Sequence, residues 1–211
     1  MKTWVFDLDG TLVDSFGHYY LILEGLIKRS MSEDEKKSVV AQAPVDFLTQ
    51  QFGLERLQEL MAQVYSQGIK DTETIAAYPG AADFLKSLKE SNRDVVVFTN
   101  RDLESSSLIL KHSGLSPMVD HLVSGTCVTA KKPSPEGLHL IHKKFAGNKE
   151  DYVMVGDHDC DMQAAQSFGA HGIRASWHNY WIDSVCDISH KQFFKFDEFT
   201  KWSRSHILSI S

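Results

Sequence analysis

The sequence predicts an α/β protein with a doubly wound, Rossmann-like, mainly parallel sheet and a small inserted all-helical cap domain. Short apolar runs rich in β-branched and aromatic residues alternate with helical patterns along most of the chain, as in βαβ units. One interval, from residue 15 to about 78, holds helical patterns only. Polar residues directly follow several of the apolar runs, at the edge where parallel sheets bind their ligands.

Buried strands are expected in short apolar runs that contain Val, Ile, Tyr, Phe or Trp. These runs are KTWVFD (2–7), VVVFTN (95–100), HLVSG (121–125), YVMVGD (152–157) and HGIRAS (171–176).

Helical patterns separate these strands. They are AADFLKSLKES (81–91), LESSSLILKHSG (103–114), PEGLHLIHKKF (135–145) and MQAAQSFG (162–169). Ser134 and Pro135 stand where an N-cap and a first helical residue would stand. The segment FFKFDEFTKW (193–202) is expected to close the core, with its phenylalanines over one end of the sheet.

Residues 15–78 are predicted to form the cap domain, inserted into a core made of residues 1–14 and 79–211. Its amphipathic patterns are YYLILEGLIKR (19–29), DEKKSVVAQA (34–43) and LERLQELMAQVYSQ (54–67). In the first pattern, the expected buried stripe is Leu21, Ile22, Leu26 and Ile27.

Composition restricts the class of protein. The 211 residues are 42% hydrophobic, enough for one good core plus a small accessory domain, and the formal net charge is −6, which argues against a general nucleic-acid binder. No uncharged run approaches the roughly 18 residues of a membrane span, and the N-terminal residues have no long apolar stretch typical of a signal peptide. Three cysteines at unrelated spacings, Cys127, Cys160 and Cys186, favour a reducing, cytoplasmic location.

Acidic, hydroxyl and ammonium groups follow the predicted strands. They are Asp7 and Asp9, Thr99 and Asn100, Lys131 and Lys132, and Asp157, Asp159 and Asp161. Crowded carboxylates repel one another unless a cation joins them, and oxygen ligands favour Mg²⁺. A magnesium site beside a hydroxyl and a lysine indicates a phosphorylated substrate. The GxxxxGK[ST] pattern of P-loop nucleotide sites is absent from the sequence.

Four motifs occur in a fixed order: DLDGT (7–11), VVFTN (96–100), KKPSP (131–135) and GDHDCD (156–161). With YPGA (78–81), they make the chain resemble haloacid dehalogenase (HAD) superfamily hydrolases that carry a helical cap after the first strand, in particular the phosphoglycolate phosphatase-like group. The resemblance covers the core and says little about the cap.

The resemblance implies a role for each catalytic and substrate-binding position. Asp7 would be the nucleophile that takes the phosphoryl group, and Asp9 the general acid that later acts as the base. Thr99 and the amide of Asn100 would bind phosphoryl oxygens. Lys132 would pair with Asp7 and the phosphate and offset charge in the transition state.

The same resemblance implies a magnesium cofactor. Its ligands would be the side chain of Asp7, the backbone carbonyl of Asp9 and the side chain of Asp157. Asp161 lies where the family has a second acid, which binds the metal directly or through water.

The function predicted from these features is a Mg²⁺-dependent phosphatase that hydrolyses a small phosphorylated metabolite through an aspartyl-phosphate intermediate. One alternative is a phosphosugar mutase of the β-phosphoglucomutase type. Such mutases resemble DGVLxDSExxH after the first strand, but here Phe16 replaces the glutamate and His18 stands one position early. The other alternative is a non-catalytic regulator that binds a phosphorylated ligand.

The sequence does not identify the substrate or the oligomeric state. Five further side chains could contact the substrate: His18, Tyr19, Tyr20, Arg101 and His158. The other interpretations are packing between cap helices for the first three, a surface salt bridge for Arg101, and solvent exposure for His158.

Overall fold

A central parallel sheet organises the protein in the computed structural model, which describes residues 2–42, 44–70, 72–178 and 188–208. The six strands lie in the order β5-β4-β1-β6-β7-β8, and every pairing between neighbours is parallel. They span Thr3–Phe6 (β1), Asp94–Phe98 (β4), His121–Val123 (β5), Tyr152–Gly156 (β6), His171–Ala175 (β7) and Lys191–Phe193 (β8). The predicted α/β, doubly wound fold is confirmed.

The five strands expected from apolar runs are all present, and β8 is the strand of this six-stranded sheet that the sequence analysis missed. The segment 193–202 was expected only to close the core. Instead Phe193 ends β8, which pairs with β7, and the chain then enters α9 (Phe196–Leu208). A three-residue strand with the sequence KQF carries no hydrophobic alternation that could have predicted it.

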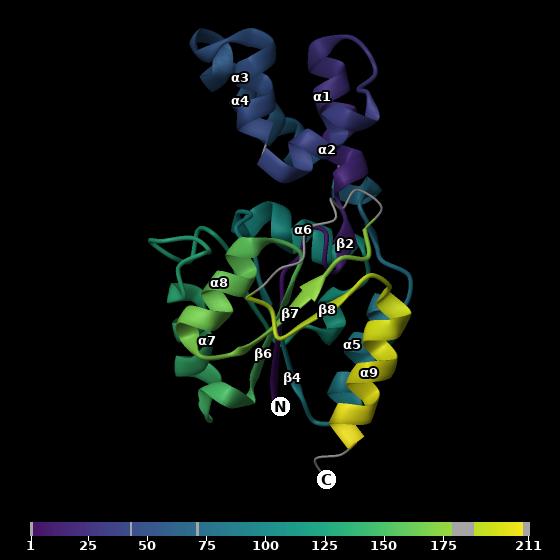
Figure 1. Cartoon of the computed structure of the whole chain (residues 1–211), viewed down its shortest axis with the longest axis vertical. Coiled ribbons are helices and arrows are strands. Elements are labelled where there is room, and N and C mark those ends of the chain that lie inside the picture. The colour runs from purple at the N-terminus through teal and green to yellow at the C-terminus, as the bar shows by residue number, and fades with distance from the viewer. Residues whose placement is uncertain (1, 43, 71, 179–187, 209–211) are drawn as a thin grey trace.

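Helices cover both faces of the sheet (Figure 1). Side chains of α5 (Ala81–Glu90), α6 (Leu103–His112) and α9 pack in one hydrophobic cluster, and those of α7 (Glu136–Phe145) and α8 (Asp159–Phe168) in another. Helix α7 begins one residue later than predicted, so Pro135 is its N-cap residue and the expected N-cap role of Ser134 is wrong. Ser134 lies one residue further out, where its Oγ accepts a hydrogen bond from the Glu136 backbone N–H at 3.3 Å.

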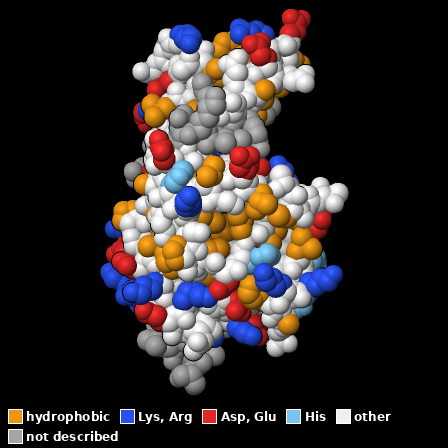
Figure 2. All heavy atoms as spheres, turned by 180° about the vertical axis from the view of Figure 1, so that it is seen from behind, with side chains coloured by type: hydrophobic (Ala, Val, Ile, Leu, Met, Phe, Trp, Pro, Cys, Tyr) orange, Lys and Arg blue, Asp and Glu red, His pale blue; other side chains and the backbone are white. Residues whose placement is uncertain are grey.

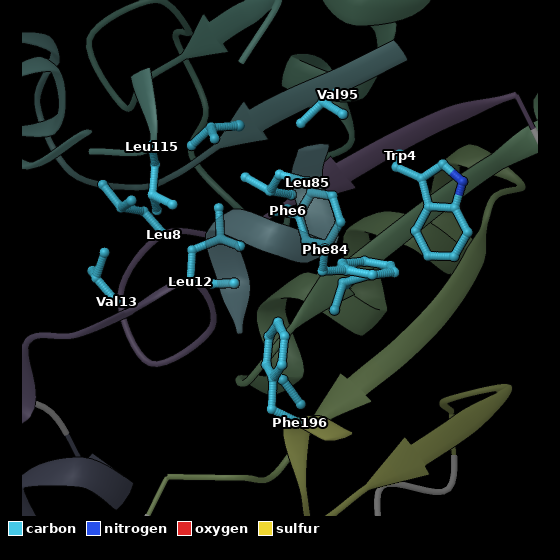
Figure 3. Packing of buried hydrophobic residues seen from close by; sticks show 14 of the residues in the cluster. Trp4, Phe6, Leu8, Leu12, Val13, Phe84, Leu85, Val95, Leu115 and Phe196 are labelled. Atoms are coloured by element: carbon cyan, nitrogen blue, oxygen red, sulfur yellow. The ribbon is translucent and has the colours of Figure 1, made fainter. Parts of the chain in front are cut away.

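Side chains of β1 alternate between these two clusters. Trp4 and Phe6 point into the first, and Val5 points into the second. Phe84 of α5 meets Trp4 and Phe6 edge to face, with ring centroids 5.8 and 6.2 Å apart (Figure 3). Because both faces are buried, β1 has a continuous apolar sequence, and it is held rigidly at the centre of the protein.

A group of helices lies beyond the carboxyl ends of the strands, at the top of Figure 1. This helical insert consists of α1 (Phe16–Ile27), α2 (Glu33–Gln42), α3 (Pro44–Phe52) and α4 (Leu54–Lys70). It has its own core, which includes Tyr20, Leu23, Phe47, Leu48 and Leu60.

The buried stripe predicted for α1 is partly wrong. Ile22 is buried, and Leu26 and Ile27 pack against the insert's core as predicted, but Leu21 is 68% exposed. Phe16, Tyr20 and Leu23, which were not part of the predicted stripe, also pack there, and with Ile27 they are spaced by four, three and four residues. Residues at this spacing lie on one face of a helix, and Leu21 lies outside that face.

A small antiparallel pair joins the two ends of the helical insert. β2 (Val13–Asp14) pairs with β3 (Ala76–Ala77), and Tyr78 N–H donates to the Leu12 carbonyl at 2.9 Å. The expectation that residues 15 to 78 hold no strand is therefore wrong at its end. Two-residue strands are too short to show a periodicity.

The surface mixes charge types. On the face shown in Figure 2, hydrophobic side chains gather over the core, and Lys or Arg side chains lie close to Asp or Glu side chains around them. Among the described residues, no helix combines the length and the hydropathy that crossing a bilayer requires.

Candidate active site

The site lies at the carboxyl edge of the sheet, beside β1. β1 lies between β4 and β6, and the strand order runs outward from it in opposite directions. Open α/β sheets bind their ligands at such a reversal of strand order. Asp7 directly follows β1, Thr99 follows β4 and Asp157 follows β6. The strand ends therefore bring the predicted side chains to one place.

A tight turn follows Asp7. Gly10 has a φ of +71°, its N–H donates to the Val13 carbonyl at 2.9 Å, and a Cβ at this position would lie 2.4 Å from Asp157 Oδ2. Glycine therefore permits both the backbone conformation and the close approach of the two acidic loops.

Lys132 lies at the centre of the cluster. Its Nζ donates to Asp7 Oδ1 and to Asp161 Oδ1, both at 2.6 Å, and to the Phe98 carbonyl at 2.9 Å. Asn100 fixes the loop of Lys132, because its Oδ1 accepts from the Lys132 N–H at 2.9 Å and its Nδ2 donates to the Lys132 carbonyl at 3.1 Å. Lys131 is exposed, so Lys132 is the lysine that reaches the acids.

Three buried carboxylates surround this ammonium group. Oxygens of Asp7, Asp157 and Asp161 all lie within 4.8 Å of one another. Burial raises the pKa of Asp7 to about 7, although Lys132 opposes the shift. Burial and the charge of Asp7 also raise the pKa of Asp157 well above its usual range.

The ammonium of Lys132 stays charged in this setting. Burial alone would lower the pKa of Lys132, but the carboxylates of Asp161 and Asp7 outweigh it and raise that pKa. A single ammonium among three carboxylates leaves excess negative charge on hard oxygen donors. The residues present therefore fit a divalent cation such as Mg²⁺.

Asp161 is fully buried at the first turn of α8, and both of its oxygens accept hydrogen bonds. Oδ1 accepts from Lys132, and Oδ2 accepts from the His158 backbone N–H at 3.0 Å. A Cβ on Gly156 would lie 2.3 Å from Asp161 Cγ, so glycine lets Asp161 fold back over the end of β6. His158 is exposed and caps the helix, its Nδ1 accepting from the Cys160 N–H at 3.3 Å.

Asp9 pairs with Arg101, a contact that the sequence did not predict. Nε and Nη2 of Arg101 donate to the two carboxylate oxygens of Asp9 at 2.9 and 2.7 Å. Although burial opposes the shift, Arg101 lowers the pKa of Asp9. The two residues are far apart in the sequence. The arginine side chain is only 8% exposed and that of Asp9 is 25% exposed, so the salt bridge expected at the surface is in fact partly buried.

The three aromatic candidates of α1 point in different directions. Tyr19 Oη accepts a hydrogen bond from Arg101 Nη2 at 3.3 Å. His18 Nδ1 lies 3.3 Å from Thr74 Oγ1, and Tyr20 Oη donates to the Lys36 carbonyl at 3.2 Å within the helical insert. Tyr19 is thus the one of the three that reaches Arg101.

His178 forms part of the wall of the site and was missed in the sequence. Its Nε2 lies 3.7 Å from Asp157 Oδ2, its ring centroid lies 5.0 Å from that of Phe16, and burial lowers the pKa of His178 to about 4. Neighbouring Trp177 donates from Nε1 to the Thr11 carbonyl at 3.1 Å. The residues that follow, 179–187, lie outside the described part of the chain.

The chain belongs to the haloacid dehalogenase-like hydrolase family, whose model matches residues 4–175. It is 28% identical over 182 residues to a phosphoglycolate phosphatase of Aquifex aeolicus, covering 84% of this chain and 85% of the relative. A phosphoglycolate phosphatase of Rhodobacter capsulatus is 26% identical over 176 residues, covering 78% and 80%.

The fold of a predicted phosphoglycolate phosphatase from Haemophilus somnus 129pt is similar, with a TM-score of 0.82. Identity is 23%, and the match covers 96% of this chain and 98% of that one. The resemblance to this superfamily and the expected enzyme class, a phosphatase, are confirmed.

Proposed function

We propose that the protein is a Mg²⁺-dependent phosphatase that hydrolyses a small-molecule phosphomonoester through an aspartyl phosphate on Asp7. One observation carries the proposal: Asp7 directly follows β1, Lys132 Nζ lies 2.6 Å from Asp7 Oδ1, and Asp157 and Asp161 lie beside it. Relatives named phosphoglycolate phosphatases make 2-phosphoglycolate the first physiological substrate to test.

In the first half of the reaction, a carboxylate oxygen of Asp7 attacks the phosphorus and the bond from phosphorus to the leaving oxygen breaks. Asp9 gives its proton to that oxygen, which leaves as the alcohol. The Thr99 hydroxyl, the backbone amide of Asn100 and the Lys132 ammonium hold the phosphoryl oxygens. The side chain of Asn100 is engaged with the Lys132 backbone, so the backbone amide is the better donor.

In the second half, water attacks the phosphorus of the aspartyl phosphate, and Asp9 takes the proton from that water. Inorganic phosphate leaves, the Asp7 carboxylate is restored and Asp9 is protonated again. Lys132 offsets the negative charge in both steps, a contribution that is large where water is excluded.

Asp7, the Asp9 backbone carbonyl and Asp157 would hold the magnesium ion. When bound, it neutralises charge between the phosphoryl group and the acids. Both oxygens of Asp161 already accept hydrogen bonds, so its contact with the metal is best made through water.

Residues 15–78 would act as a cap domain over a core of residues 1–14 and 79–211. Closure would exclude water and place the leaving alcohol against residues of the cap. The substrate in this proposal is a small metabolite of the cytoplasm.

The experiment is release of inorganic phosphate from p-nitrophenyl phosphate with and without Mg²⁺. Asp7→Asn should stay folded and lose nearly all turnover, while Asp83→Asn, a change of an exposed acid on α5, should keep it. A mutase would release little phosphate, and a non-catalytic regulator none. Ordinary activity in Asp7→Asn would show that the covalent mechanism is wrong.

A further inference from the structure

Arg101 connects both catalytic loops with the helical insert. It follows β4, and its guanidinium holds the carboxylate of Asp9, which follows β1. Its Nη2 also donates to Tyr19 Oη at 3.3 Å, and the guanidinium carbon lies 5.5 Å from the Tyr19 ring centroid. Since Tyr19 belongs to α1, a single cation contacts the insert and the acid that the mechanism uses.

Both oxygens of Asp9 are engaged in this arrangement. In the proposed reaction, one of them must face the oxygen of the leaving alcohol at hydrogen-bond distance. An oxygen that accepts from Arg101 is directed at the guanidinium and not at the leaving group. Asp9 must therefore move off Arg101 before it can act.

Arg101 then needs another anion. Its guanidinium is permanently charged and its side chain is only 8% exposed, so removing its partner is costly. The charge of the neighbouring Asp102 also favours the charged form of Arg101, but its oxygens cap α6 by accepting from the backbone N–H and the hydroxyl of Ser105. A planar carboxylate on the substrate matches the guanidinium fork in the same bidentate way as Asp9.

We propose that Arg101 is the subsite for a carboxylate on the leaving alcohol, and that Asp9 occupies this subsite until the substrate binds. The inference rests on the proposed function and assigns the residue that would bind the carboxylate of a phosphorylated hydroxy acid. The substrate carboxylate takes the two guanidinium N–H groups and releases Asp9 toward the phosphoryl group. Once it has left the cation, Asp9 takes up from solvent the proton that it then gives to the leaving oxygen. Tyr19 shares the guanidinium and places α1 beside the bound carboxylate.

Two matched substrates test the exchange in the full-length protein: 2-phosphoglycolate, and ethyl phosphate, in which a methyl group replaces the carboxylate. Arg101→Met should lower kcat/KM for 2-phosphoglycolate about 10- to 100-fold, the loss of a charged hydrogen-bonded contact. For ethyl phosphate, kcat/KM should not fall, because Asp9 is no longer held. Arg101→Lys should recover part of the loss, and Arg56→Met, an exposed change on α4, should alter neither value.

A binding measurement makes the test independent of turnover. In the Asp7→Asn protein, adding Arg101→Met should raise the calorimetric Kd of 2-phosphoglycolate about 10-fold or more and leave that of inorganic phosphate unchanged.

An equal fall of kcat/KM for both substrates, or an unchanged Kd for 2-phosphoglycolate, overturns the subsite and leaves the phosphatase proposal standing. A wild-type protein that hydrolyses neither substrate nor p-nitrophenyl phosphate refutes the phosphatase proposal instead, and the calorimetry still decides the role of Arg101.

Discussion

Lys132→Met should strongly destabilise the metal-free protein at alkaline pH. Its ammonium lies 2.6 Å from oxygens of both Asp7 and Asp161, and its side chain is 2% exposed. Methionine has nearly the same length and keeps the apolar contacts of the stem, but it removes the charge. The substitution leaves a buried group of carboxylates without its central cation.

The size of the effect follows from this geometry. Removing one partner of a buried ion pair typically costs about 3–5 kcal/mol. A chain of 211 residues has a free energy of unfolding on the order of 10 kcal/mol, so the variant should still fold without denaturant.

The dependence on pH has a definite sign. Burial raises the pKa of Asp7 from 3.8 to about 7, so between these values the folded state keeps a proton that the unfolded chain has lost. This lowers stability as pH rises, with no penalty below about pH 4 and the full penalty above about pH 7. Without Lys132 the folded pKa of Asp7 rises further. The part of the loss that comes from Asp7 therefore appears above about pH 7, because near pH 5 Asp7 is protonated with or without the lysine. The loss of the contact with Asp161 remains at both pH values.

Urea denaturation in EDTA at pH 5 and pH 8, followed by circular dichroism, measures this loss. We expect a decrease of about 3–5 kcal/mol at pH 8. At pH 5 the decrease should be smaller by up to about 1.4 kcal/mol, which corresponds to the one pKa unit between 7 and 8. Lys131→Met, a change of the exposed neighbour, should have little effect at either pH. Equal losses for the two variants, or a loss that does not depend on pH, would refute the reasoning.

Two other predictions test the metal site and the helical insert. Asp9→Asn should lower kcat with little change in Mg²⁺ affinity, whereas Asp157→Asn should raise the calorimetric Kd for Mg²⁺; identical titrations would contradict the assigned roles. Ser32→Ala removes a capping box in which Ser32 Oγ accepts from the Glu35 N–H and Glu35 Oε2 accepts from the Ser32 N–H. This change should destabilise α2 by about 1 kcal/mol, seen as faster hydrogen exchange of its amides, and unchanged exchange would show that the box contributes nothing.

The predictable part of the fold is the part buried on both faces. β1 and β6 are buried at every residue, so their sequences are largely apolar runs. Such runs can be recognised in the sequence without a structure. The site could be predicted from the same runs, because the ends of parallel strands meet at one edge. β3 and β8 could not be predicted, since strands of two and three residues are fixed by the partner to which they bond and not by their own pattern.

The limit of sequence reasoning is clearest in the motif DLDGT, where Asp7 and Asp9 are identical side chains two positions apart. Nothing local distinguishes them. Burial in the acidic cluster raises the pKa of Asp7 to about 7 even with Lys132 beside it, while Arg101 lowers the pKa of Asp9. Lys132 and Arg101 follow different strands, β5 and β4, so only the assembled sheet gives the two acids different partners. Resemblance to a family motif lets the sequence analysis assign different roles to Asp7 and Asp9. The physical cause of that difference lies in the tertiary structure.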